Sequence, residues 1–224
     1  MKLATLARLA LATVALATTG AAPNWNTTVV QTDGGHRIGN PDAKVKLKEF
    51  VSYTCPHCAH FARDGDGALQ IAYIGPGKVS VEIRHIIRDP VDLTAALLTN
   101  CGPANKFQRN HAAFMLGQSK WIGPLMSASD GQRQRWYSGD KSTRFRAIAS
   151  DFGFYAIMEQ RGYTRSQVDR CLADVKLAEK LAADTETDSD KYKISGTPSF
   201  VLNGLTLAGT HSWDMLQPQL DARF

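Results

Sequence analysis

The feature that most constrains the fold is a break in the strand pattern along the chain. Residues 45–52 (VKLKEFVS) and 78–87 (KVSVEIRHII) alternate apolar and polar side chains, as half-buried strands do. Over residues 89–191 the apolar residues follow helical spacing instead. Strand character returns at 193–209, where an Asn203-Gly204 hairpin turn separates two short strands. This order predicts one α/β sheet whose chain is interrupted by an inserted helical domain.

The domain boundaries follow from this order. We assign residues 23–88 and 192–224 to the sheet-containing domain, and residues 89–191 to the helical insertion. Further elements are predicted from local patterns: a strand at 26–32, a turn-rich loop at 33–44, a helix at 58–74, helices over 103–118, 142–160 and 164–187, and a final amphipathic helix with Ser212 as its N-cap.

The first 22 residues have the pattern of a secretory leader. Lys2 and Arg8 come early, an apolar run extends from about Leu9 to Ala17, and small residues follow. A transmembrane helix is the alternative, but this run is far shorter than the roughly 20 apolar residues that a span requires. We therefore expect a signal peptide at 1–22 and a periplasmic mature protein.

Charge and cysteine content limit the classes of function. The leader contains two of the 26 basic residues and none of the 21 acidic ones, so the mature chain carries a net charge of +3. Without clusters of Lys and Arg, nucleic acid is not an expected partner. Exported proteins meet oxidising conditions, in which the four cysteines can persist as disulfides.

Two of these cysteines form the tetrapeptide Cys55-Pro56-His57-Cys58, directly after a predicted strand. Proline is favoured at the first position of a helix, which places Cys55 at the N-cap. There the free N–H groups and the positive end of the helix dipole stabilise a thiolate, and a protonated His57 would add to this effect. Cys55 is then the attacking sulfur and Cys58 is the buried resolving partner. A stabilised thiolate also makes the disulfide a stronger oxidant.

Other uses of this cysteine pair fit the sequence less well. A zinc site would need two further ligands, for which His57, His60 and Cys101 are available, but the chain has no second CxxC. Attached haem would require a histidine where Ala59 stands. A purely structural disulfide would close a loop too small to constrain the unfolded chain. We expect neither a metal nor a cofactor.

Two positions outside the tetrapeptide could contribute to the same chemistry. Glu49 shares a strand face with Val45, Leu47 and Val51. A carboxyl group buried on this face would have a raised pKa and could shuttle the proton of the resolving thiol. The alternative is an ion pair with Lys46 or Lys48. Pro198 precedes a strand in the segment SGTPSF, either with a cis peptide bond or as an ordinary loop proline.

The segments KEFVSYTCPHCAHF and KISGTPSFVLNG, which bracket the helical block behind a leader, resemble those of the DsbA-type thiol–disulfide oxidoreductases. The resemblance implies a thioredoxin-like fold with an inserted helical domain, Cys55 as nucleophile and Cys58 as resolving thiol. It further implies a cis Pro198, with Thr197 helping to bind extended substrate peptides. A threonine before this proline also resembles disulfide isomerases and reductases, whereas many oxidases carry valine there.

The remaining cysteines, Cys101 and Cys171, both lie in the helical block. A structural disulfide between them would close a loop of about 70 residues and could stabilise the fold by roughly 4 kcal/mol in the chain-entropy model. A second redox couple and two free thiols are the alternatives.

Together these features favour an exported oxidase that donates the Cys55–Cys58 disulfide to newly translocated proteins with free thiols. The resemblance implies reoxidation by a quinone-linked membrane oxidoreductase. Residues 23–44 are too short for the dimerisation domain that isomerases often carry, so we expect a monomer. An isomerase or reductase is the nearest alternative, and a periplasmic metal-binding protein that uses the same thiolates is the alternative from another class.

Overall fold

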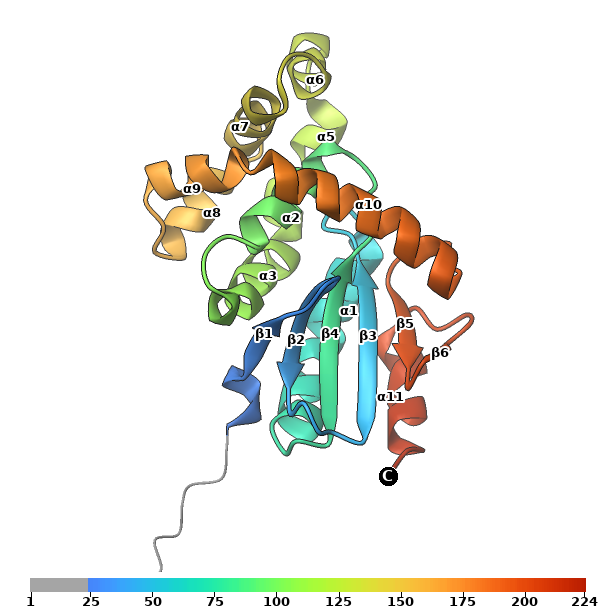
Figure 1. Cartoon of the computed structure of the whole chain (residues 1–224). Coiled ribbons are helices and arrows are strands. Elements are labelled where there is room, and N and C mark those ends of the chain that lie inside the picture. The colour runs from blue at the N-terminus through green and yellow to red at the C-terminus, as the bar shows by residue number, and fades with distance from the viewer. Residues whose placement is uncertain (1–23) are drawn as a thin grey trace, which may run out of the picture.

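The computed structural model describes residues 24–224, which fold around a six-stranded mixed sheet (Figure 1). The strand order is β1-β2-β4-β3-β5-β6. Strands β3 and β4 run parallel, and every other neighbouring pair is antiparallel. The strands are β1 (Val29–Gln31), β2 (Gly35–Gly39), β3 (Val45–Val51), β4 (Val79–His85), β5 (Ser199–Leu202) and β6 (Leu205–Thr206).

The central strand β3 forms where the sequence predicts it. Its register places Glu49 opposite Ile83 of β4 and Phe200 of β5. Lys46 is exposed and Lys48 is half-buried, whereas the other five residues of the strand are buried. Phe50 lies on the same face as these lysines and is nevertheless fully buried, because a helix covers that end of the strand.

The prediction of a loop at 33–44 was wrong, because β2 occupies its centre. Three glycines gave this segment the composition of a turn, but Gly35 has a different role. A Cβ atom on Gly35 would lie 2.0 Å from the carbonyl oxygen of Ile83, so only glycine permits the close approach of β4. The strand predicted at 26–32 is also shorter than expected, since residues Trp25–Thr27 form a 3-10 turn before β1.

One face of the sheet is covered by α1 (Pro56–Ala68) and α11 (Trp213–Asp221), which lie behind the strands in Figure 1. The two helices pack closely, since a Cβ atom on Gly65 would meet the Trp213 ring at 2.8 Å. The expected helix over 58–74 is not uniform: α1 ends at Ala68 and continues as a π-helix, η2 (Leu69–Ile74). At α11, Ser212 occupies the predicted N-cap position but makes no side-chain capping hydrogen bond.

Between β4 and β5 the chain is helical throughout. Its helices are α2 (Pro90–Thr99), η3 (Ala104–Lys106), α3 (Phe107–Leu116), α4 (Gln118–Trp121), α5 (Pro124–Ser127), α6 (Asp130–Tyr137), α7 (Lys141–Asp151), α8 (Phe154–Gln160), α9 (Arg165–Leu172) and α10 (Val175–Tyr192). The long helix α10 crosses the upper part of the other sheet face (Figure 1), where Asp188 pairs with Arg84 and Tyr192 packs against Phe50. The architecture agrees with the predicted α/β sheet interrupted by helices.

The sheet and the helical block share one apolar core. Leu47 and Val81 of the sheet belong to the same cluster of buried side chains as Phe114 and Phe154 of the block. Continuous burial of this kind stabilises both parts together, so the block is packed onto the sheet rather than tethered to it. Within residues 24–224 no helix is both long and apolar enough to cross a membrane. The expected signal peptide lies outside the described residues.

Candidate active site

The Cys55–Cys58 pair lies where the chain leaves β3 and enters α1. Cys55 is the N-cap of α1 with extended backbone angles, and Pro56 occupies the first helical position, as the sequence predicts. Cys55 is 4% exposed and Cys58 is 1% exposed, whereas Pro56 and His57 are open to solvent. Both thiols are free. The tetrapeptide therefore places one sulfur at the surface end of the helix and the other inside.

The two thiols have opposite acidities. A hydrogen bond from the Cys58 thiol lowers the pKa of Cys55 to about 5, and contacts with Thr197 and the backbone N–H groups of Cys58 and His57 act in the same direction against burial. Burial raises the pKa of Cys58 well above its usual value, and the neighbouring Cys55 raises it further. At neutral pH Cys55 is thus a thiolate and Cys58 is a thiol, which suits a nucleophile and its resolving partner.

The loop before β5 completes the surface around Cys55. The Thr197–Pro198 peptide bond is cis, and the Cys55 sulfur lies 3.2 Å from the carbonyl oxygen of Thr197. The His211 ring nitrogen Nδ1 lies 2.7 Å from the carbonyl oxygen of Pro198 and donates to it. No local sequence pattern marks His211 for this contact, which joins two segments 13 residues apart.

Carboxylates of the helical block hold the loop that leads into Cys55. Asp92 accepts hydrogen bonds from the Ser52 hydroxyl at 2.6 Å and from the Tyr53 N–H at 2.7 Å. Asp89, the N-cap of α2, accepts one from the Thr54 hydroxyl at 2.7 Å. Both acids lie at the start of α2, so this helix fixes the three residues that precede the nucleophile.

Gln118 of α4 holds the same loop from another side. Its amide nitrogen donates to the carbonyl oxygens of Tyr53 at 2.7 Å and Cys55 at 2.8 Å. The Tyr53 hydroxyl in turn bonds Thr99 and the His111 ring. These partners are 46 to 65 residues apart in the sequence, and no local pattern could have paired them. The helical block therefore supports the active-site loop directly.

Glu49 lies on the α1 side of β3 with 4% of its surface exposed. Burial, and secondarily the negative charge of Asp66, raise the pKa of its carboxyl well above the usual value. An ion pair with a neighbouring lysine does not form, because Lys48 on the opposite face pairs with Glu82 and Lys46 is exposed. The structure therefore agrees with a buried Glu49 carboxyl group and not with an ion pair to Lys46 or Lys48.

No group of three or more His, Cys, Asp or Glu side chains with the geometry of a metal site occurs among residues 24–224. His57 is exposed at the second position of α1, and His60 pairs with Asp64 on the surface of the same helix. The side chains that the sequence offered as further zinc ligands thus point to different surroundings.

Comparison with known families agrees with this geometry. A family model described as thioredoxin matches residues 31–222, nearly all of the chain that the structure describes. The chain belongs to the thioredoxin family.

Solved structures extend this assignment. The crystal structure of a protein-disulfide isomerase from Novosphingobium aromaticivorans is similar, with 53% sequence identity and a TM-score of 0.83 over 86% of this chain and 98% of that one. The alpha-DsbA1 protein of Wolbachia pipientis shares the fold, with a TM-score of 0.63 at 21% identity over 83% of this chain and 88% of that one. These neighbours support the thioredoxin-like fold class.

Among curated sequences, a Rickettsia bellii protein with the provisional name protein-disulfide oxidoreductase is 31% identical over 169 residues. The match covers 75% of this thioredoxin-family chain but only 56% of the Rickettsia protein. The chain therefore spans little more than half the length of the curated relatives it matches.

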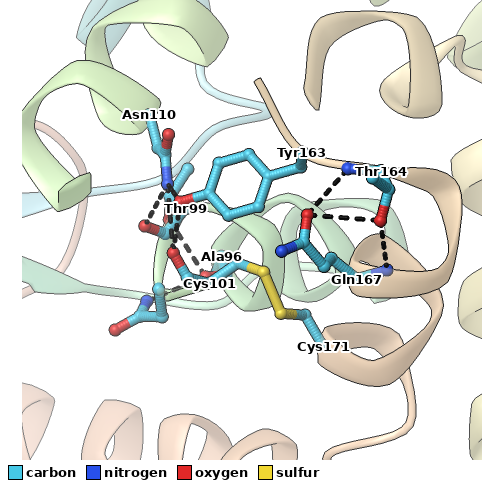
Figure 2. Close-up of a disulfide and its surroundings, with 9 residues drawn as sticks. Ala96, Thr99, Cys101, Asn110, Tyr163, Thr164, Gln167 and Cys171 are labelled. Atoms are coloured by element: carbon cyan, nitrogen blue, oxygen red, sulfur yellow. Dashed lines mark hydrogen bonds between the residues drawn. A yellow bond between two sulfur atoms is a disulfide. The ribbon is translucent and has the colours of Figure 1, made fainter. Parts of the chain in front are cut away.

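The second cysteine pair of this thioredoxin-family chain forms a disulfide. Cys101 follows α2, Cys171 lies in α9, and their sulfurs are 1.96 Å apart at a sequence separation of 70 (Figure 2). The carbonyl oxygen of Cys101 accepts hydrogen bonds from the Tyr163 hydroxyl at 2.6 Å and from Asn110 at 3.3 Å. The bridge ties the first helix of the block to a late one.

Proposed function

We propose that this chain is an exported protein thiol–disulfide oxidoreductase that acts as an oxidase on newly translocated proteins. The observation that carries the proposal is the lowered pKa of Cys55, about 5, at the N-cap of α1. A stabilised thiolate favours the reduced enzyme, so the Cys55–Cys58 disulfide is readily reduced and acts as a strong oxidant.

The reaction proceeds through one mixed disulfide. A substrate thiolate attacks the Cys55 sulfur of the oxidised enzyme, the bond to Cys58 breaks, and Cys58 leaves as a thiolate that takes up a proton. A second substrate thiolate then attacks the substrate sulfur, which releases Cys55 as a thiolate. The substrate loses two electrons and gains a disulfide, while the enzyme gains two electrons as a thiolate and a thiol.

The other predicted site residues have supporting roles in this proposal. Pro56 starts the helix that stabilises the thiolate, and His57 adds positive charge beside it when protonated. Thr197 and the cis Pro198 present backbone groups to an extended substrate segment next to Cys55. Glu49 donates a proton to the Cys58 thiolate and accepts it back when the disulfide forms again. We further propose that residues 23–88 and 192–224 form the thioredoxin-like domain and residues 89–191 the inserted helical domain.

The cellular setting belongs to the same proposal. A secretory leader at 1–22 would deliver a monomeric enzyme to the periplasm, where a quinone-linked membrane oxidoreductase would reoxidise it. The Cys101–Cys171 bridge supports an oxidising compartment, because such bonds persist where thiols are not kept reduced.

A second candidate is disulfide isomerisation. It is favoured by the name of the Novosphingobium neighbour at 53% identity, and by Thr197 in front of the cis proline. An isomerase needs a substantial reduced population that can attack wrong disulfides, whereas an oxidase needs the oxidised form.

The deciding experiment is a redox equilibrium with glutathione, in which alkylation and mass measurement report the state of Cys55 and Cys58. We expect the pair to stay largely reduced in a mildly oxidising mixture, which identifies a strong oxidant. A pair that stays oxidised under strongly reducing glutathione would exclude the oxidase. Repair of a scrambled disulfide protein, measured alongside, would support the isomerase.

A further inference from the structure

A cavity of about 30 Å³ lies between the sheet and α1, on the side where Cys58 is buried. Apolar side chains of β2, β4 and η2 form most of its wall, and its polar lining consists of Glu49, Asp66, Gln70, Gln108 and His111. This volume is enough for a water molecule where polar partners are present. The mechanism above uses only one of these polar groups.

The cavity brings together two carboxyl groups from different elements. Glu49 comes from β3, and Asp66 comes from the last turns of α1, where it is half-buried. Burial raises the pKa of Asp66 to about 7, and no cation contributes to the pKa of either acid. Two carboxyl groups that face one small apolar cavity cannot both ionise at low cost, so the pair retains a proton near neutral pH.

The helix connects this acid pair to the resolving cysteine. Cys58, Ala62 and Asp66 recur at every fourth residue, so they share one stripe of α1. Cys58 and Ala62 are buried against the sheet, and at about 1.5 Å per residue Asp66 lies roughly 12 Å beyond Cys58 along the axis. Glu49 of β3 lines the cavity together with Asp66, and the charges of both Glu49 and Cys58 act on the buried Tyr53 hydroxyl.

The cavity also approaches the surface. Gln70 and Gln108 line it and are only half-buried. Gln70 belongs to the π-helix η2, in which the N–H of Gly75 donates to the Gln70 carbonyl five residues earlier. A π-turn widens a helix locally and is frequent at functional sites. The acid pair thus has solvent within reach where Gln70 and Gln108 line the cavity.

We propose that Asp66 is a positioning residue for the proton of the resolving thiol: together with Glu49 it holds one proton, which Glu49 delivers to Cys58, and it receives a replacement from solvent through the cavity. The inference rests on the proposed function. When substrate opens the disulfide, Cys58 leaves as a thiolate, the Glu49 carboxyl protonates it, and the Asp66 carboxyl reprotonates Glu49. The reverse transfer frees the Cys58 thiolate when the enzyme is reoxidised.

Few other titratable groups face the pair. From α3, the His111 ring lines the cavity, and burial keeps it neutral by lowering its pKa to about 4. Tyr53, whose hydroxyl bonds His111, is neutral because burial raises its pKa. The neighbouring lining residues of β2, β4 and η2 are uncharged, and Cys58 is the acceptor itself. The two carboxyl groups therefore account for any titration of the cavity between the pKa values of His111 and Cys58.

The test is the rate at which dithiothreitol reduces the Cys55–Cys58 disulfide of the full chain from about pH 5 to pH 9, as the ratio of variant to parent. Asp66→Asn removes the negative charge that raises the pKa of Glu49. Glu49 then ionises at a lower pH, so less of it is protonated as the pH rises. We expect the ratio of the two reduction rates to be near one at pH 5 and to fall about tenfold by pH 8. This decrease is smaller than the roughly 10²-fold or more that a positioned general acid contributes, because Glu49 is still present. Asp66→Glu should restore the parent profile.

Two further variants make the test specific. Asp64→Asn removes an exposed acid of the same helix and should follow the parent at every pH. Glu49→Gln should slow reduction throughout, and adding Asp66→Asn to it should change nothing more, because Asp66 acts through Glu49. An Asp66→Asn profile identical to that of Asp64→Asn would overturn the proposal, as would additive effects in the double variant.

The outcomes separate this inference from the function on which it rests. If the parent chain exchanges disulfides but Asp66→Asn matches it, only the role of Asp66 is wrong. If the parent does not exchange disulfides, the proposed function itself fails. Should Asp66→Asn not fold, infrared spectroscopy of the parent replaces it: a protonated carboxyl band at pH 7 that is weakened in folded Glu49→Gln supports the pair, and a band that Glu49→Gln leaves unchanged overturns it.

Discussion

The two cysteine pairs of this chain have the same side-chain chemistry but differ in spacing, bonding and surroundings. Cys55 and Cys58 are three residues apart at the start of α1 and are free, whereas Cys101 and Cys171 are 70 residues apart and joined. The first pair meets helix N–H groups and a peptide carbonyl at the surface end of the sheet. The second lies inside the helical block among Tyr163 and Asn110. Surroundings, rather than the presence of sulfur, decide which pair can exchange electrons.

The strongest way to break this comparison is to remove one sulfur from the first pair. Cys55→Ser should reduce disulfide transfer to a model dithiol peptide to the uncatalysed rate, because without the Cys55 sulfur there is no Cys55–Cys58 disulfide for the substrate thiolate to attack. The matched control is the double variant Cys101→Ala/Cys171→Ala, which should keep the transfer rate within a few-fold under conditions where it is folded. Loss of transfer in the control alone would mean that the roles of the pairs are exchanged.

The same double variant should have a large effect on stability. Closing a loop with a sequence separation of 70 stabilises the folded state by about 4 kcal/mol in the chain-entropy model. We expect a comparable decrease in the free energy of unfolding measured with urea. Reduction of the Cys55–Cys58 pair in the parent should not reproduce that loss, because its loop is short. A double variant as stable as the parent would argue against a structural role for the bridge.

Gln118 sharpens the comparison, because it connects the helical block to the reactive pair. Gln118→Ala leaves the carbonyl oxygens of Tyr53 and Cys55 without their buried donor, which costs about 1–3 kcal/mol. We expect a higher pKa for Cys55 and a several-fold slower disulfide exchange. The pH dependence of Cys55 alkylation measures the pKa. Gln134→Ala, at a site on α6 remote from the loop, serves as the control. An unchanged pKa of Cys55 in Gln118→Ala would show that the loop keeps its geometry without this side chain.

The last predicted effect is a pH dependence that only the reactive pair can produce. The pKa of Cys55 is about 5 in the folded protein and about 8.5 in an unfolded chain. Its contribution to the stability of the reduced protein is therefore complete above about pH 8.5 and is lost as the pH falls towards 5. The raised pKa of Cys58 adds an opposite slope only near and above about pH 8.5, where the unfolded thiol ionises, so the lower part of the window reports Cys55 alone.

The measurement is the difference in unfolding free energy between reduced and oxidised protein across this pH window. The difference should shift in favour of the reduced form as pH rises, since the disulfide form has no thiol to titrate. A flat difference would contradict the lowered pKa of Cys55. The Cys101–Cys171 bridge is present in both forms and cancels.

The sequence predicted the parts of the site that depend on neighbours along the chain. The N-cap position of Cys55, the helix start at Pro56 and the burial of Glu49 follow from local spacing. Strand β2 was missed because glycines that permit close contact with β4 look like turn glycines when only composition is visible.

The support of the loop could not be predicted at all. Gln118, Asp92 and His211 have no special pattern around them, and their meaning depends on contacts with residues 13 to 65 positions away. Asp66 is a similar case, since the local sequence gives an acid near the end of a helix no sign of burial, and only the tertiary structure shows that it lines the cavity. Local physics fixed the reactive group, and the tertiary fold decided what surrounds it.

The ends of the sheet have a consequence for the proposed action on newly translocated proteins. The outer strands β1 and β6 contain only three and two residues, respectively. An exposed strand edge offers unpaired N–H and C=O groups on which another extended chain can nucleate aggregation, and short edges limit that templating. A thiol–disulfide enzyme that repeatedly meets extended polypeptides would thereby engage them next to Cys55 without seeding their assembly along its own sheet.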